Sequence, residues 1–220
     1  MDPSACPTAD GPAILSSGCA LCCLAEKSTE HSLRAFFAEF VNDPQVRADF
    51  RRARGFCAKH LPLLAHCGDA LGVSIIYADL AGEAVSRWKS GAVGDEPASL
   101  LGWLRPVPRR AAKAVCPSCA AEAEAEHRYA AALAQGLARD PALWDVVIAG
   151  GGLCSRHVET VAKAARPADS ARLLNIQAGK MEALLRELEE FVRKNDYRFK
   201  GEPWGSERDA WRRALARLRP

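Results

Sequence analysis

Four short motifs recur in this chain at one fixed spacing, and they limit how the chain can fold. The chain contains two Cys-x-x-Cys pairs (CALC and CPSC) and two Cys-x-x-His segments (CAKH and CSRH). One pair and one segment lie in each half of the chain. Each residue of the first set is followed 97 positions later by its counterpart. The first set is Cys19, Cys22, Cys57 and His60, and the second is Cys116, Cys119, Cys154 and His157. A single long period indicates one duplication rather than a solenoid.

The repeat extends beyond these motifs and predicts two tandem modules. Asp43-Pro44 is followed 97 residues later by Asp140-Pro141, and Gly55 by Gly152. Between the two copies, a segment with Gly and Pro breakers is typical of a linker. We therefore predict an N-terminal tail (1–17), module one (18–92), a linker (93–114), module two (115–190) and an aromatic and basic C-terminal arm (191–220).

Both modules show the pattern of amphipathic helices. Leu33, Phe37 and Phe40 follow one another at four- and three-residue spacing, which places them on one helical face. Each Asp-Pro pair is typical of an N-cap followed by proline in the first turn, and Gly55 and Gly152 favour helix ends. No segment alternates clearly between apolar and polar residues. The predicted fold class is therefore all-α, with about four helices in each module.

Each module supplies three thiols and one imidazole in the order C-x2-C-x34-C-x2-H. Free backbone N–H groups and the helix dipole stabilise thiolates at the start of a helix, and thiolate is the form that binds metal. A Cys-x-x-Cys pair that faces a Cys-x-x-His segment forms a tetrahedral Cys3His set, which suits Zn²⁺. We predict one zinc ion in each module, hence two per chain. The predicted ligands are Cys19, Cys22, Cys57 and His60 in module one, and Cys116, Cys119, Cys154 and His157 in module two.

Other chemistry of the same residues stays open. Two [4Fe–4S] clusters with Cys3His ligation would make the chain an electron-transfer protein. Direct use of the thiols would make it a redox sensor or a thiol enzyme. Covalent haem attachment requires a histidine directly after the Cys pair, which neither copy has. Four protein ligands leave no open coordination position, so the pattern favours a structural role over catalysis.

Some candidate ligands have no counterpart in the other half of the chain. Cys6, Cys23 and Cys67 are expected to be small buried or surface thiols. Glu124 and His127 have the Glu-x-x-His spacing of di-iron bundles, but the first module lacks this motif. A solvated helix face is therefore the favoured interpretation of this pair.

The composition and the first residues of the chain indicate where the protein is located and whether it inserts into a membrane. The chain has 220 residues, is 49% hydrophobic and carries a formal net charge of +3, which is ordinary for a soluble globular protein. No apolar run approaches about 18 residues, so we expect no insertion into a membrane. The acidic start lacks the basic region of a signal peptide, which indicates the cytoplasm.

The C-terminal arm concentrates basic and aromatic residues. Residues 193–220 contain nine Lys or Arg and four Asp or Glu. The rest of the chain is therefore slightly acidic, which disfavours a nucleic-acid binder. We expect the two tryptophans of the arm to dock it onto the modules, with its arginines in solvent. The candidate surface for a protein partner consists of Trp204, Trp211, Arg212 and Arg213.

The duplicated Cys-x-x-Cys and Cys-x-x-His motifs, followed by DYRF and EPWG near the end, resemble those of an uncharacterised bacterial family of helical proteins. The resemblance covers nearly the full chain and implies no activity, but it supports a common role for the eight Cys and His residues. The predicted function is a non-catalytic, two-site metal-binding protein. In this hypothesis zinc is a structural staple, and the chain has a protein-interaction or adaptor role.

Overall fold

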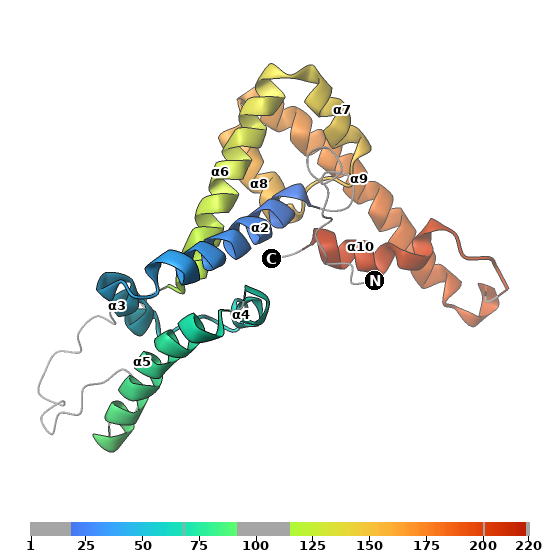
Figure 1. The fold of residues 1–220 in the computed structure, drawn as a ribbon. Coiled ribbons are helices and arrows are strands. Elements are labelled where there is room, and N and C mark those ends of the chain that lie inside the picture. The colour runs from blue at the N-terminus through green and yellow to red at the C-terminus, as the bar shows by residue number, and fades with distance from the viewer. Residues whose placement is uncertain (1–18, 68, 92–114, 200, 219–220) are drawn as a thin grey trace, which may run out of the picture. The chain divides into compact units, whose positions relative to one another are not determined.

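The computed structural model describes residues 19–67, 69–91, 115–199 and 201–218, and for 65–67 only the backbone (Figure 1). Within these ranges the chain forms helices and turns and no β-strand, so the all-α fold class is confirmed. The predicted tail (1–17) and the predicted linker (93–114) lie outside the described residues. In chain order the elements are α2 (Ala20–Ala35), the π-helical η1 (Phe36–Phe40), α3 (Pro44–Ala53), α4 (Leu61–Cys67), α5 (Ala70–Lys89), α6 (Pro117–Arg139), α7 (Pro141–Ala149), α8 (Ser155–Ala164), α9 (Pro167–Lys194), η3 (Tyr197–Phe199), η4 (Ser206–Asp209) and α10 (Ala210–Arg217).

Aspartate caps fix where α3 and α7 begin. The Asp43 carboxylate accepts hydrogen bonds from the backbone N–H groups of Gln45 and Val46 at 2.8 and 3.0 Å. Asp140 accepts one from the N–H of Ala142 at 2.9 Å. In both helices proline occupies the first turn. Both predicted Asp-Pro starts are therefore confirmed, and such a cap contributes about 0.5–2 kcal/mol.

Left-handed residues end α3 and precede site-forming segments. Arg54 has φ 58° and Gly55 has φ 87°, and the Gly55 N–H donates to the Phe50 carbonyl at 3.0 Å. Gly152, with φ 84°, lies three residues beyond α7. A Cβ atom on Gly152 would lie 2.7 Å from the Arg217 guanidinium. Glycine is therefore required at 152 for both conformation and space.

Two compact units divide the chain, namely Met1–Glu26 with Ala125–Pro220 (unit 1) and Lys27–Glu124 (unit 2). The division falls inside α2 and inside α6, so each helix contributes to both units. Each unit therefore combines parts of both sequence repeats. The predicted module boundaries and the superposition of the two repeats stay predictions. The helix starts agree with the repeat, because three pairs of first residues lie 97 positions apart: Ala20 and Pro117, Pro44 and Pro141, and Ala70 and Pro167.

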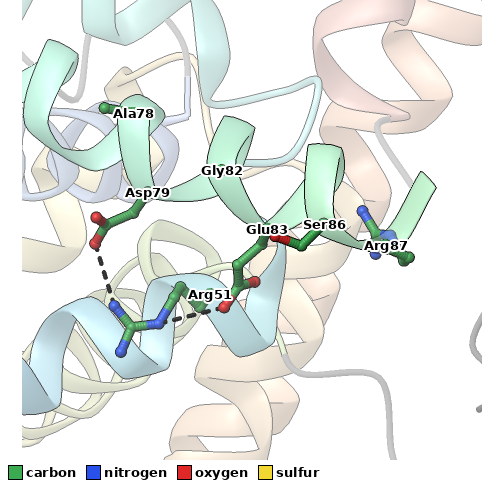
Figure 2. Close-up of a pocket in the computed structure, with 7 residues that line it drawn as sticks. All are labelled: Arg51, Ala78, Asp79, Gly82, Glu83, Ser86 and Arg87. Atoms are coloured by element: carbon green, nitrogen blue, oxygen red, sulfur yellow. Dashed lines mark hydrogen bonds and ion pairs between the residues drawn. The ribbon is translucent and has the colours of Figure 1, made fainter. Parts of the chain in front are cut away.

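Unit 2 is built around aromatic and aliphatic side chains from η1, α3 and α5. Its buried core contains Leu33, Phe37, Val41, Phe50, Phe56, Leu64, Ile76 and Cys116. At its edge, α3 and α5 are joined by ion pairs: Arg51 lies 3.1 Å from Asp79 and 3.4 Å from Glu83 (Figure 2). Arg47 also pairs with Asp79 at 2.5 Å. These contacts hold α3 against α5 and leave an open hollow of about 540 Å³ beside them.

Unit 1 has a separate core that α6, α7, α8 and α9 supply together with the start of α2. Its buried residues are Leu21, Ala130, Ala134, Leu137, Trp144, Val147, Leu153, Val161 and Leu173. The indole N–H of Trp144 donates to the Leu137 carbonyl at 2.9 Å, and the Arg172 guanidinium lies 4.3 Å from the centre of the Trp144 ring. Across the described ranges, no helix combines the length and the apolar character that crossing a membrane requires.

Candidate metal centres

The eight repeated Cys and His residues form two groups. Site 1 consists of Cys19, Cys22, Cys154 and His157, and site 2 consists of Cys57, His60, Cys116 and Cys119. Within each group one ligand atom from every residue lies within 4.8 Å of the others. Site 1 belongs to unit 1 and site 2 to unit 2.

The predicted assignment of one site to each repeat is wrong. In both sites the Cys-x-x-Cys pair of one repeat meets the Cys-x-x-His segment of the other. The cause is the division of the chain into units, which falls inside α2 and inside α6. The Cys pair at the start of α2 therefore belongs to unit 1, and the Cys pair at the start of α6 belongs to unit 2. The start of α2 therefore meets the start of α8, and the start of α6 meets the turn before α4. Each group of candidate ligands therefore combines residues from both sequence repeats.

In site 1 three sulfurs surround one imidazole nitrogen. His157 Nδ1 lies 3.2 Å from Cys19 Sγ, 3.3 Å from Cys22 Sγ and 3.2 Å from Cys154 Sγ. The sulfurs of Cys22 and Cys154 are 3.7 Å apart. Cys154 and His157 are fully buried, and the other two cysteines are partly buried. All four side chains therefore converge on one interior point.

Site 2 has the same arrangement. His60 Nδ1 lies 3.3 Å from Cys57 Sγ, 3.7 Å from Cys116 Sγ and 3.4 Å from Cys119 Sγ. The sulfurs of Cys57 and Cys119 are 3.6 Å apart. His60 and Cys116 are buried, and the remaining two cysteines are partly buried. Each site can therefore hold a metal ion with the donor set of three sulfurs and one nitrogen.

Local structure explains why these side chains point together. Cys19 and Cys116 directly precede α2 and α6, and Cys154 is the N-cap residue of α8. Cys57 heads a tight turn in which the N–H groups of His60 and Leu61 donate to its carbonyl at 2.9 and 3.0 Å. A helix start directs backbone N–H groups and the positive end of its dipole toward nearby thiolates. The predicted positions of the Cys pairs at helix starts are confirmed.

Crowding of the thiols makes them share protons unequally. Hydrogen bonds from Cys19 and Cys22 hold the pKa of Cys154 far below its usual range. In site 2, burial and a hydrogen bond to Cys57 raise the pKa of Cys119 to about 12. Burial lowers the pKa of His157, but hydrogen bonds to the thiolates of Cys154 and Cys19 outweigh it and give a pKa of about 10. A cation at each centre would replace these shared protons.

A carboxylate lies beside Nε2 of each site histidine, and no repeated sequence motif indicates it. Glu122 lies 3.4 Å from Nε2 of His60 and 2.6 Å from Nζ of Lys59. Glu126 lies 3.4 Å from Nε2 of His157 and pairs with Arg156. The sequence offers one hint of these carboxylates: a basic residue directly precedes each histidine, Lys59 in the first repeat and Arg156 in the second. The two glutamates are four residues apart on α6 and have no acidic counterparts on α2.

The unduplicated candidates whose side chains the structure describes belong to neither site. Cys23 is buried and disulfide-bonded, so the expected thiol is wrong at this position. Cys6 and the side chain of Cys67 lie outside the described residues. Glu124 and His127 are exposed on α6 and belong to neither group, in agreement with a solvated helix face.

The C-terminal arm packs on α9 through one of its tryptophans. The Trp204 ring lies 5.2 Å from the Phe191 ring, and Arg213 pairs with Glu187 at 2.5 Å. Trp204 and Trp211 expose 43% and 44% of their surface. With Arg208 and Arg212 they line a hollow of about 710 Å³. Docking by Trp204 agrees with the prediction, whereas Arg213 is ion-paired rather than solvated. Binding of a partner here stays a prediction.

Comparison with known proteins places the chain in a family. Residues 13–220 match the family described as "Family of unknown function (DUF6062)". The chain belongs to this family. A similar protein from Caldicellulosiruptor sp. (strain Rt8B.4), described as an uncharacterized 23.9 kDa protein in the xynA 3' region, is 27% identical over 184 residues. The alignment covers 82% of this chain and 83% of that protein. No solved structure matches the chain. The predicted membership of an uncharacterised family is thus confirmed.

Proposed function

We propose that this chain is a non-catalytic metalloprotein that holds one zinc ion in each of its two Cys3His sites. The observation that carries the proposal is the convergence of three sulfurs on one Nδ1 atom, at 3.2–3.3 Å in site 1 and 3.3–3.7 Å in site 2. With Zn–S bonds of about 2.3 Å and Zn–N bonds of about 2.0–2.1 Å, a tetrahedral ion places such atoms roughly 3.5–3.8 Å apart.

The same distances weigh against the alternative of two iron–sulfur clusters. A [4Fe–4S] cluster binds each protein ligand to a different iron, which spreads the ligand atoms far beyond these separations. The sulfur pairs at 3.7 Å in site 1 and 3.6 Å in site 2 leave no room for a cluster between them. An electron-transfer role therefore has less support than a zinc role.

A structural role follows from the closed donor set. Four protein ligands leave no position for water or substrate, and the ligands of each site come from segments far apart in the sequence. An ion in site 1 would tie α2 to α8, and an ion in site 2 would tie α6 to the turn before α4. Its binding energy would then become folding energy. The six cysteines of the two sites are free thiols in the described structure and are therefore available as ligands.

Within this proposal the chain acts as an adaptor, with the arm as its contact surface. The hollow beside Trp204 and Trp211 combines exposed aromatic rings with Arg208 and Arg212. Aromatic and arginine side chains are the residues that most often anchor protein interfaces. Zinc would serve to keep the helices that carry this surface in place.

Elemental analysis and absorption spectra of the full chain, purified without oxygen, test the metal assignment. We expect a colourless protein with two zinc ions per chain and no acid-labile sulfide. A brown protein with iron and sulfide that bleaches on reduction would replace zinc with clusters. A chain free of both, in which the six cysteines of the two sites react as free thiols, would refute metal binding and support the thiol redox sensor.

A further inference from the structure

Both site histidines turn Nδ1 toward the sulfurs, which leaves Nε2 on the far side of the ring. In site 1, Nδ1 of His157 is within 3.3 Å of all three sulfurs. A neutral imidazole that binds metal through Nδ1 must carry its proton on Nε2, so Nε2 becomes a hydrogen-bond donor. The surroundings of Nε2 therefore decide whether this tautomer is stable.

The Nε2 atom of His157 is fully buried and has no hydrogen-bond partner among the described residues. The carboxylate of Glu126, on α6, is 3.4 Å from it and only 14% exposed. In site 2 the carboxylate of Glu122 has the same position, 3.4 Å from Nε2 of His60 and 17% exposed. Two independent sites thus place a partly buried acceptor at the same place beside the ring.

A neighbouring cation holds each carboxylate in place. Lys59 Nζ lies 2.6 Å from both oxygens of Glu122, and Arg156 pairs with Glu126. These basic residues directly precede the site histidines and lie 97 positions apart in the sequence. A charge-assisted pair of this kind fixes the orientation of the carboxylate beside the imidazole ring.

We infer that Glu122 and Glu126 are positioning residues, each accepting a hydrogen bond from the Nε2–H of the metal-binding histidine in its site. This inference rests on the proposed function, because it assigns these residues a role toward the bound ion. Each glutamate fixes the tautomer and the ring orientation that present Nδ1 to the metal. Partners of this kind, outside the direct ligands, typically change metal affinity about 10–100-fold.

The two glutamates differ in what else they hold. Glu122 lies on α6, the helix whose start carries the Cys pair of the same site (Cys116 and Cys119). Glu126 also lies on α6, but the ligands of site 1 come from α2 and α8. Glu126 therefore brings a third helix to site 1. Its loss should lower the stability of unit 1 as well as metal affinity, whereas loss of Glu122 should act mainly on metal affinity.

The test uses the full zinc-loaded chain and its Glu122→Ala, Glu122→Gln, Glu126→Ala and Glu126→Gln variants. Competition with a chelator should show one site weakened about 10–100-fold in each alanine variant and the other site unchanged. Each glutamate variant is thus the matched control for the other. Glu159→Ala on α8 should leave both affinities unchanged, because this exposed glutamate belongs to neither site and pairs with Lys163 at 3.8 Å.

Spectroscopy and the glutamine variants separate positioning from a general effect on folding. In ¹⁵N-histidine spectra of the wild-type protein we expect metal on Nδ1 and a slowly exchanging proton on Nε2. Each alanine variant should speed the exchange of the Nε2 proton in the histidine of its own site only. Each glutamine variant keeps an acceptor oxygen and should therefore recover most of the metal affinity. Unchanged affinity and proton exchange in the alanine variants, or metal on Nε2, would overturn the inference alone. A wild-type chain that binds no metal would instead overturn the proposed function.

Discussion

Replacing one cysteine and one histidine together distinguishes the exchanged ligand sets from sites confined to one repeat. In the structure, Cys19 and His157 belong to site 1, and His60 belongs to site 2. The double variant Cys19→Ala/His157→Ala removes two ligands from site 1 and none from site 2. The double variant Cys19→Ala/His60→Ala removes one ligand from each site.

The size of the effect follows from the number of ligands left. Structural zinc sites bind with about 10–16 kcal/mol, so an average ligand contributes about 2.5–4 kcal/mol. Loss of one ligand should therefore weaken a site roughly 10²–10³-fold. Because a domain is stable by only about 5–15 kcal/mol, a unit without its ion should also melt at a much lower temperature.

The assay is metal content after dialysis against a chelator that the wild-type sites withstand and a weakened site does not. We expect the wild type to keep both zinc ions, Cys19→Ala/His157→Ala to keep one, and Cys19→Ala/His60→Ala to keep none. The exposed pair His31→Ala/His127→Ala serves as a control that keeps both. If Cys19→Ala/His157→Ala kept no zinc and Cys19→Ala/His60→Ala kept one ion, each repeat would hold its own ion. That result would refute the exchanged arrangement.

Three further changes test the packing around the sites. Gly152→Ala, which forces a side chain onto φ 84° and against Arg217, should destabilise unit 1 by about 1–3 kcal/mol and weaken site 1 but not site 2. A thermal melt and zinc competition identical to wild type would contradict this. Asp140→Ala should remove the cap of α7 and cost about 0.5–2 kcal/mol in chemical denaturation, while Asp140→Asn should retain most of it; equal losses would exclude a capping role. The backbone N–H of Gly205 and the ammonium of Lys194 lower the pKa of Glu207 to about 2, so its stabilising effect is complete above the ordinary pKa of 4.5 and disappears as the pH falls toward 2. The difference in stability between wild type and Glu207→Gln should shrink across that interval, and a difference independent of pH would argue against the linkage.

Local sequence patterns were sufficient to predict the helices and the set of candidate ligands. Asp43 and Asp140, each followed by proline, predict helix starts because a carboxylate cap and a fixed φ angle act over a few residues. The Cys-x-x-Cys and Cys-x-x-His spacings likewise bring their own two side chains together without help from distant residues. For this reason the eight proposed ligands could be named from the sequence, and the structure gathers all eight into two groups.

The pairing of those motifs was decided by tertiary structure alone. Both Cys pairs have the same spacing and chemistry, so either Cys-x-x-His segment could complete either site at equal local cost. Packing of the helices makes the choice: α2 starts in unit 1 beside α8, and α6 starts in unit 2 beside the turn that carries Cys57 and His60. The same packing brings Glu122 and Glu126 to the histidines, although neither lies within a repeated motif. The sequence by itself determined which residues can bind metal, because that depends on short-range geometry. Which of them share an ion depends on contacts between segments far apart in the chain, and only the folded structure specifies those contacts.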